Sequence, residues 1–173
     1  SSWQVTEDSP VRMADIYDGE TYDATKETTG WHNAAPETLK ITPAITAEYG
    51  APVRAHEVMR PVAITTAKDG EVIYDFGQNF AGVIHMKLNG KAGQVITVRH
   101  AEILNQDGTL NTTFLRTAKA TATYTCRDGE QEYSPRFSYM GFRYAGVKGI
   151  DPKELEIEAV ALYSDVAQHG GFH

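Results

Sequence analysis

The sequence predicts an all-β protein that folds as an antiparallel β-sandwich similar to a jelly roll. Apolar and polar residues alternate with a period of two through most of the chain, whereas a helical period is almost absent. Turn residues separate the alternating stretches at roughly ten-residue spacing, which is typical of sandwiches and jelly rolls. Together these patterns predict about seven to nine strands around one core.

The first predicted strands precede residue 77. The stretch 53–66 is rich in β-branched residues but is interrupted by Pro61, which indicates an edge, a bend or a bulge. Asp69-Gly70 predicts a type I′ hairpin turn. A strand at 71–76 is expected directly after that turn.

The strands that follow show one-sided burial patterns. In 83–88, alternate residues are apolar and polar residues stand opposite, as in a half-buried strand. In 94–104, Ile96, Val98 and His100 are predicted to share one face. The remaining predicted strands are 121–127, 132–139, 142–147 and 154–163.

Two stretches lack alternation. Residues 110–122 are predicted to be a long loop with a helical turn, and long loops in compact domains often carry function. Residues 1–36 carry scattered aromatic side chains, among them Trp3, Tyr22 and Trp31, and these are expected to pack against another part of the protein. The self-contained domain is predicted to begin after Pro36.

The composition excludes several classes of protein. The chain has 173 residues, 41% of them hydrophobic and 23% charged, which argues against disorder and against a fibrous protein. The net charge is −7 and the basic residues are scattered, so no nucleic acid partner is predicted. No apolar run approaches the ~20 residues of a membrane span, so no membrane partner is predicted. The single cysteine, Cys126, cannot form an internal disulfide and is predicted to be a buried, reduced packing residue.

Two strand-end segments are rich in polar residues: Asp75, Gln78 and Asn79 in one, and Arg99, His100 and Glu102 in the other. Asp75-Phe76-Gly77 matches a kinase metal motif, but the other kinase motifs are absent. A bend at Gly77, with Asp75 or Asn79 capping backbone amides, explains it better. A His100–Glu102 pair would suit acid–base chemistry, although a structural hydrogen bond is favoured. We expect the six residues to form a mainly structural polar network.

No catalytic residue, cofactor or metal site is predicted. His169 and His173 are four residues apart, but Gly170 and Gly171 between them disfavour the helix that a metal site would need. The sequence lacks the Gly-x-Ser-x-Gly motif of a nucleophilic serine. Glycoside hydrolysis needs two carboxyl groups across one sugar bond, and no sequence pattern pairs any two of the 23 acidic residues.

Five aromatic residues near the C-terminal half have two interpretations. They would stack on sugar rings if exposed, as in carbohydrate-binding modules, but their strand parity favours burial in the sandwich core. The five are Tyr133, Phe137, Tyr139, Phe142 and Tyr144.

An ordered series of motifs runs along nearly the whole chain. It comprises Ile16-Tyr17-Asp18-Gly19-Glu20-Thr21-Tyr22, Gly30-Trp31, Pro52-Val53-Arg54, Asp75-Phe76-Gly77-Gln78-Asn79, Arg99-His100-Ala101-Glu102, Leu115-Arg116-Thr117-Ala118-Lys119, Pro135-Arg136-Phe137, Gly141-Phe142-Arg143-Tyr144 and Tyr163-Ser164-Asp165. This series resembles bacterial α-L-rhamnosidases of the inverting glycoside hydrolase type.

The resemblance implies a place within a larger enzyme. Residues 1–36 resemble the C-terminal remnant of a preceding N-terminal β-sandwich, 37–165 resemble a second β-sandwich, and 166–173 resemble a linker toward an (α/α)6 catalytic barrel. The general acid and base of such enzymes belong to the barrel, so no catalytic residue carries over to this chain. The start of the chain, which has no signal peptide pattern, likewise suggests a piece of a longer protein, and its compartment stays open.

The leading hypothesis is therefore a non-catalytic β-sandwich region of an α-L-rhamnosidase, inactive alone. Its expected partners are the catalytic barrel and the N-terminal sandwich of the same parent chain, with a rhamnosylated glycan as a further candidate. The alternative is an autonomous carbohydrate-binding module, and a pure adhesion or interaction domain is a third hypothesis.

Overall fold

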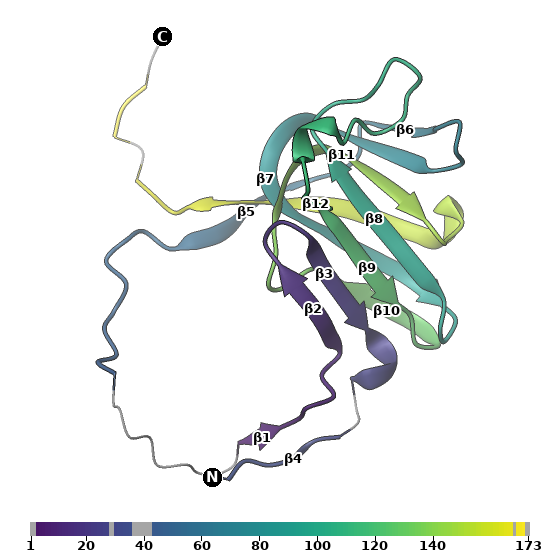
Figure 1. Cartoon of the computed structure of the whole chain (residues 1–173). Coiled ribbons are helices and arrows are strands. Elements are labelled where there is room, and N and C mark those ends of the chain that lie inside the picture. The colour runs from purple at the N-terminus through teal and green to yellow at the C-terminus, as the bar shows by residue number, and fades with distance from the viewer. Residues whose placement is uncertain (1–2, 28–29, 36–42, 168, 172–173) are drawn as a thin grey trace.

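The structure of the protein is a computed structural model, and it describes residues 3–27, 30–35, 43–167 and 169–171. The described residues form β-strands, three short 3₁₀ helices and connecting loops, with no α-helix (Figure 1). None of their helices has the length and apolar character needed to span a membrane. The strands are β1 (Gln4–Val5), β2 (Val11–Asp15), β3 (Gly19–Asp23), β4 (His32–Asn33), β5 (Val53–Met59), β6 (Ala63–Thr66), β7 (Val72–Gly90), β8 (Val95–Ala101), β9 (Thr121–Thr125), β10 (Gly129–Tyr133), β11 (Met140–Lys148) and β12 (Leu155–Ser164). The 3₁₀ helices are η1 (Ala24–Lys26), η2 (Thr113–Leu115) and η3 (Pro152–Glu154).

The long strand β7 joins the two layers of the fold. Its first residues, Val72–Asp75, pair with β6 and β11, whereas Val83–Leu88 pair with β12 and Met86–Gly90 pair with β10. From β11, the first layer continues through β8, β9, β3 and β2, and from β12 the second layer continues to β5. Figure 1 shows β7 as a curved band that passes from one layer to the other. All these pairings are antiparallel except β3–β9, so the predicted all-β sandwich is confirmed.

The core lies between the two layers and follows the predicted alternation. Ile84, Met86 and Leu88 of β7 are buried against Ile96 and Val98 of β8. Residues of β9, β10, β11 and β12 complete this cluster, among them Tyr124, Tyr133, Phe142, Val147 and Ile157. Because side chains alternate sides along a strand, β8, β9 and β12 contribute alternate residues to the core.

Two stretches predicted as separate strands, 71–76 and 83–88, belong to the single strand β7. The predicted bend at Gly77 is present, with a φ of +84°, and the Asp75 carboxylate accepts a hydrogen bond from the Gly77 amide at 2.7 Å. The prediction that the strand ends there is wrong, because pairing with β11 resumes at Phe80. A glycine at positive φ here bends the ladder without ending it.

The turn at Asp69-Gly70 joins β6 to β7, but it is not a type I′ turn. Such a turn needs positive φ at both central residues. Only Gly70 has positive φ, +78°, and its amide donates to the Ala67 carbonyl at 3.0 Å. The hairpin prediction is therefore confirmed and its turn type is corrected.

The long loop at 110–122 contains the predicted helical turn, η2. Leu110, at its start, is buried with Ala67, Ile73 and Ala101 on the outer face of the first layer. The strand predicted at 132–139 lies earlier, as β10, and residues 134–139 are a loop. Cys126 follows β9 and is a buried free thiol, as predicted.

Residues 10–27 are built into the first layer. The β2–β3 hairpin places β3 parallel to β9, with Gly19 opposite Thr121 and Asp23 opposite Thr125. Tyr22 stacks on Tyr124 with ring centroids 5.7 Å apart, as expected for aromatic residues that pack against another part of the protein. The expected boundary after Pro36 lies outside the described residues.

Candidate functional site

The first polar segment is held by an ion pair that the sequence analysis did not include. Both carboxylate oxygens of Asp75 accept hydrogen bonds from Arg143 of β11, each at 2.8 Å. The Asp75 side chain is 19% exposed and that of Arg143 is 38% exposed. The Arg143 hydrogen bond, aided by that from the Gly77 amide, lowers the pKa of Asp75.

Arg99 is engaged by a different carboxylate, Glu71. The Arg99 Nε donates to Glu71 at 2.8 Å, and the Arg99 Nη2 bonds the second carboxylate oxygen. The Glu71 side chain is only 1% exposed, against 37% for Arg99. Gly146 makes room for this pair, because a Cβ there would lie 2.5 Å from the Glu71 carboxyl carbon. Gly146, a glycine inside the strand predicted at 142–147, is therefore the sequence signal for the close approach of Glu71 to β11.

His100 lies in the core of the sandwich. Its Nδ1 is 2.8 Å from the carbonyl oxygen of Ala120, so the neutral ring donates to that carbonyl. Burial lowers the pKa of His100 to about 4, because the protonated ring would lose its hydration. Glu102 is exposed, so no His100–Glu102 pair is available for acid–base chemistry.

The six predicted residues do not share one hydrogen-bond network. In the described part of the chain, Asp75 pairs with Arg143, Arg99 with Glu71, and His100 with a carbonyl group. Gln78 is exposed and donates to the Met59 sulfur at 3.4 Å, and Asn79 is also exposed. The two segments are brought near each other by β11, where Tyr144 lies opposite both Asp75 and Ala101.

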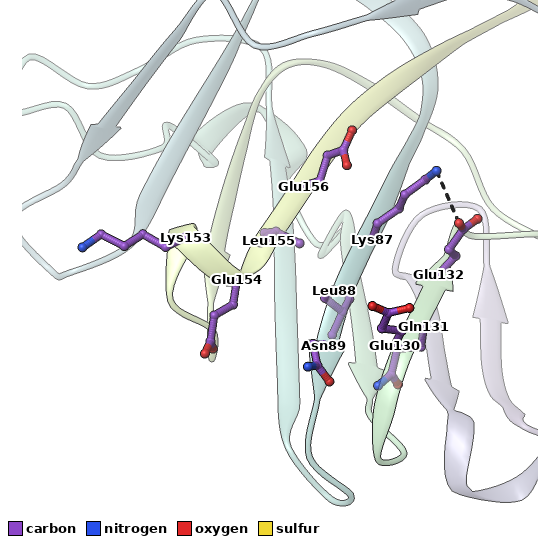
Figure 2. Close-up of a pocket in the computed structure, with 10 residues that line it drawn as sticks. All are labelled: Lys87, Leu88, Asn89, Glu130, Gln131, Glu132, Lys153, Glu154, Leu155 and Glu156. Atoms are coloured by element: carbon purple, nitrogen blue, oxygen red, sulfur yellow. Dashed lines mark ion pairs between the residues drawn. The ribbon is translucent and has the colours of Figure 1, made fainter.

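A groove of about 470 Å³ lies on the second layer between β10, β7 and η3. Figure 2 shows Glu130, Glu132, Glu154 and Glu156 around it, with Lys87 paired to Glu132 at 3.3 Å and Lys153 pointing away from that pair. The lining contains no aromatic residue on which a sugar ring could stack. General acid catalysis by a carboxyl group needs an apolar, buried site, and these four carboxylates are exposed. The groove therefore does not have the features of a glycosidase centre.

Among the described residues, no group of three or more His, Cys, Asp or Glu side chains lies close enough to hold a metal ion. Of the histidine pair in the C-terminal tail, His173 lies outside the described residues. The predicted absence of a metal site therefore stays a prediction.

The five aromatic residues divide between core and surface. Tyr133 and Phe142 are buried as predicted, and Tyr144 is half-buried. Phe137 and Tyr139 are 65% and 56% exposed, so their predicted burial is wrong. The reason is that they stand in the loop after β10 and not in a strand.

Sequence reasoning also missed Glu20, which holds the N-terminal hairpin to that loop. The side chain is fully buried and accepts hydrogen bonds from the Tyr133 hydroxyl at 3.1 Å and from the amides of Arg136 and Phe137 at 3.0 Å each. No local pattern marks Glu20, because all three donors lie more than 110 positions away in the chain.

Comparison with known proteins identifies two domain families along the chain. Residues 65–163 match the bacterial alpha-L-rhamnosidase concanavalin-like domain, and residues 1–66 match the alpha-L-rhamnosidase N-terminal domain. The chain is 39% identical over 155 residues to an alpha-L-rhamnosidase of Streptomyces avermitilis, covering 83% of this chain and 15% of that protein. It is 34% identical over 186 residues to an alpha-L-rhamnosidase of an Alteromonas species, covering 99% of this chain and 20% of that protein.

Solved structures agree with these matches. The Streptomyces avermitilis alpha-L-rhamnosidase complexed with L-rhamnose superposes with a TM-score of 0.78 at 35% identity, covering 91% of this chain and 16% of that chain. The alpha-L-rhamnosidase from Dictyoglumus thermophilum superposes with a TM-score of 0.74 at 34% identity, covering 91% and 19%. The present chain thus spans between about one seventh and one fifth of the length of these relatives.

Proposed function

The chain belongs to the bacterial α-L-rhamnosidase family, and from this premise we propose that it is a non-catalytic β-sandwich region of an enzyme that hydrolyses terminal α-L-rhamnosyl residues by inversion. The region would act as a scaffold and an interdomain surface. The observation that carries the proposal is the pair of contiguous family matches, one to an N-terminal domain and one to a concanavalin-like domain. These account for the chain from residue 1 to residue 163.

The proposal assigns the general acid and general base to another part of the parent enzyme. Inversion needs one carboxyl group to protonate the glycosidic oxygen and a second to activate water on the opposite face of the sugar. Within the described ranges, the buried carboxylates Glu20 and Glu71 are each held by structural hydrogen bonds and belong to different parts of the fold. Neither lines the groove between β10, β7 and η3, which supports a structural role.

The proposed partners are the catalytic barrel and the N-terminal sandwich of the same parent chain. Exposed aromatic side chains on loops support an interdomain surface, because aromatic residues are enriched where protein surfaces contact one another. Phe114 is 72% exposed in the loop after β8, and Phe137 and Tyr139 are exposed in the loop after β10. We propose the division at 1–36, 37–165 and 166–173 for the parent chain as well.

A turnover assay tests this function. The 173-residue chain is incubated with an aryl α-L-rhamnoside, and a full-length relative serves as the positive control. We expect no release of the aryl group above the uncatalysed rate. Turnover that survives repurification and is abolished by substituting one acidic residue of this chain would overturn the proposal.

A further inference from the structure

A second groove, of about 450 Å³, lies on the outer face of the first layer, away from the groove in Figure 2. Its floor is formed by adjacent strands that carry hydroxyl side chains, Thr21 of β3 and Thr121 and Thr123 of β9. Its wall is the end of η2 and the loop that follows, with Leu115 of η2 and Arg116 of the loop lining the groove. This volume lies within the range of about 300–1,000 Å³ that small-molecule sites occupy.

The groove is cationic in a chain whose net charge is −7. Arg99, Arg116 and Lys119 line it, against one acidic lining residue, Asp18. Two of the cations are held in place, Lys119 by Asp18 at 2.8 Å and Arg99 by the buried Glu71. In the described part of the chain no carboxylate pairs with Arg116, so its guanidinium is available for an added anion.

The backbone of the wall is strained at two non-glycine residues. Arg116 has φ of +55° and Ala120 has φ of +44°. Non-glycine residues with such φ angles are strained, and they are concentrated at ligand sites, where the strain fixes a side chain or a wall in position. Here the strained residues are Arg116 itself and Ala120, which directly follows Lys119, so they stand at the two ends of the stretch 116–120 that lines the groove.

We propose that this groove binds one or two units of an acidic glycan, a sugar that carries a carboxylate or a sulfate group. The guanidinium of Arg116 would receive the anionic group, because a planar guanidinium donates two parallel hydrogen bonds to such groups. The threonine hydroxyls, which both donate and accept, would bond sugar hydroxyl groups, and Leu115 and Met13 would cover an apolar ring face. The choice of a sugar over another anion rests on the proposed function.

Titration calorimetry on the 173-residue chain tests the inference. The probes are digalacturonate, its neutral dimethyl ester, a monosulfated disaccharide and inorganic sulfate. We expect saturable heat with digalacturonate or the sulfated disaccharide, whichever anionic group the site takes, and binding of the ester about tenfold weaker or absent. Raising the salt concentration should weaken the acidic sugar's binding, since surface charges are screened.

Two matched variants locate the site. Arg116→Gln should weaken binding of the acidic sugar about tenfold, the effect of losing one charge-assisted contact. Arg60→Gln removes the same charge from an exposed position outside the groove and should leave binding unchanged. Thermal melting of both variants checks that they are folded.

The inference fails if neither acidic sugar gives heat, if the ester or inorganic sulfate binds as tightly as the acidic sugar, or if the Arg60 and Arg116 variants lose affinity equally. These results differ from a failure of the proposed function, which would appear as turnover of the aryl rhamnoside. A chain that binds no acidic sugar and has no turnover would overturn only the inference.

Discussion

Two guanidinium–carboxylate pairs on the first layer differ in how much water reaches them. Glu71 is buried beneath Arg99, whereas Asp75 and Arg143 are both partly exposed. Removing one partner of a buried pair leaves an uncompensated charge, while water can solvate the survivor of an exposed pair. Their contributions to stability should therefore differ, although both pairs have the same chemistry.

We predict that Arg99→Ala lowers the free energy of unfolding of this chain by about 3 kcal/mol, and that Asp75→Ala lowers it by about 1 kcal/mol. Urea denaturation measures both. The double variant Glu71→Met/Arg99→Met should recover most of the Arg99→Ala loss, because it removes the stranded carboxylate.

The same substitutions in the full-length parent enzyme should change turnover by less than about tenfold, the equivalent of ~1.4 kcal/mol in a barrier. A loss of several decades in turnover with an unchanged melting temperature would contradict a structural role for these pairs.

His100 makes stability depend on pH in a defined window. Its pKa is lowered in the folded state, so the unfolded chain binds a proton that the folded chain does not. The stabilisation is complete above the ordinary histidine pKa of 6.5 and is lost as the pH falls toward about 4. We expect the chain to lose about 2–3 kcal/mol between pH 7 and 4.5.

Urea denaturation at several pH values measures this loss, with His100→Gln as the control that should flatten it. Asp69 and Asp75 have lowered pKa values, so their stabilisation is lost only below their ordinary pKa of 3.8. A wild-type slope that persists in His100→Gln would assign the effect to other groups.

Cys126 should react slowly with thiol reagents in the native protein. The side chain is buried, and burial raises the pKa of its thiol, so little of the reactive thiolate is present. Labelling with a chromogenic disulfide should become fast only in denaturant. Rapid labelling of the native chain would show that this part of the core opens readily.

At the scale of single elements, β7 is the strand that pairs with neighbours in both layers, so its backbone must fit both at once. Gly82 lies where β7 is paired with β11 and β12 at once. A Cβ at Gly82 would lie 2.2 Å from the backbone carbonyl oxygen of Val160, and backbone cannot move aside as a flexible side chain can. Only a residue without a side chain allows the strands to approach this closely.

Gly82→Ala should therefore lower the free energy of unfolding by about 3 kcal/mol, by forcing β7 and β12 apart. The matched control is Gly141→Ala on β11, where a Cβ would be 3.5 Å from the Glu102 carboxylate, an ordinary contact. Equal melting temperatures for the two variants would disprove the proposed steric role of Gly82.

Strands with a local alternating pattern were predictable from sequence, as β8 and β12 illustrate. The continuity of β7 through Gly77 was not predictable, because a glycine at positive φ can either end or bend a strand. The partners of Asp75 and Arg99 were also missed, since Arg143 lies 68 positions from Asp75, and Glu71 lies 28 positions from Arg99. Periodicity reports which face a residue occupies, but not which distant residue lies opposite.

At the scale of the whole molecule, the N-terminal hairpin and the sandwich share one sheet. β3 is hydrogen-bonded along its length to β9, and buried Glu20 bonds the loop after β10. Opening this hairpin would leave the Tyr133 hydroxyl and the amides of Arg136 and Phe137 without their acceptor and would uncover the ring of Tyr124. Hairpin and sandwich should therefore unfold together.

Hydrogen exchange tests this cooperation. We expect the ladder amides of β3 to exchange with the same opening free energy as those of β9, within about 1 kcal/mol. Glu20→Gln should lower protection in β3 more than in β12, which lies in the other layer. Independent, fast exchange of β3 in the unaltered chain would show that the hairpin is only loosely attached.

The parallel pairing of β3 with β9 also sets an order of events during synthesis. Asp18 and its partner Lys119 are 101 positions apart, so the hairpin leaves the ribosome long before the strand it joins. Closing so long a loop is entropically costly until the intervening strands have collapsed. We expect the hairpin to dock on β9 only after the strands between them have collapsed, and until then the open edge of β9 is a surface on which nascent chains mispair.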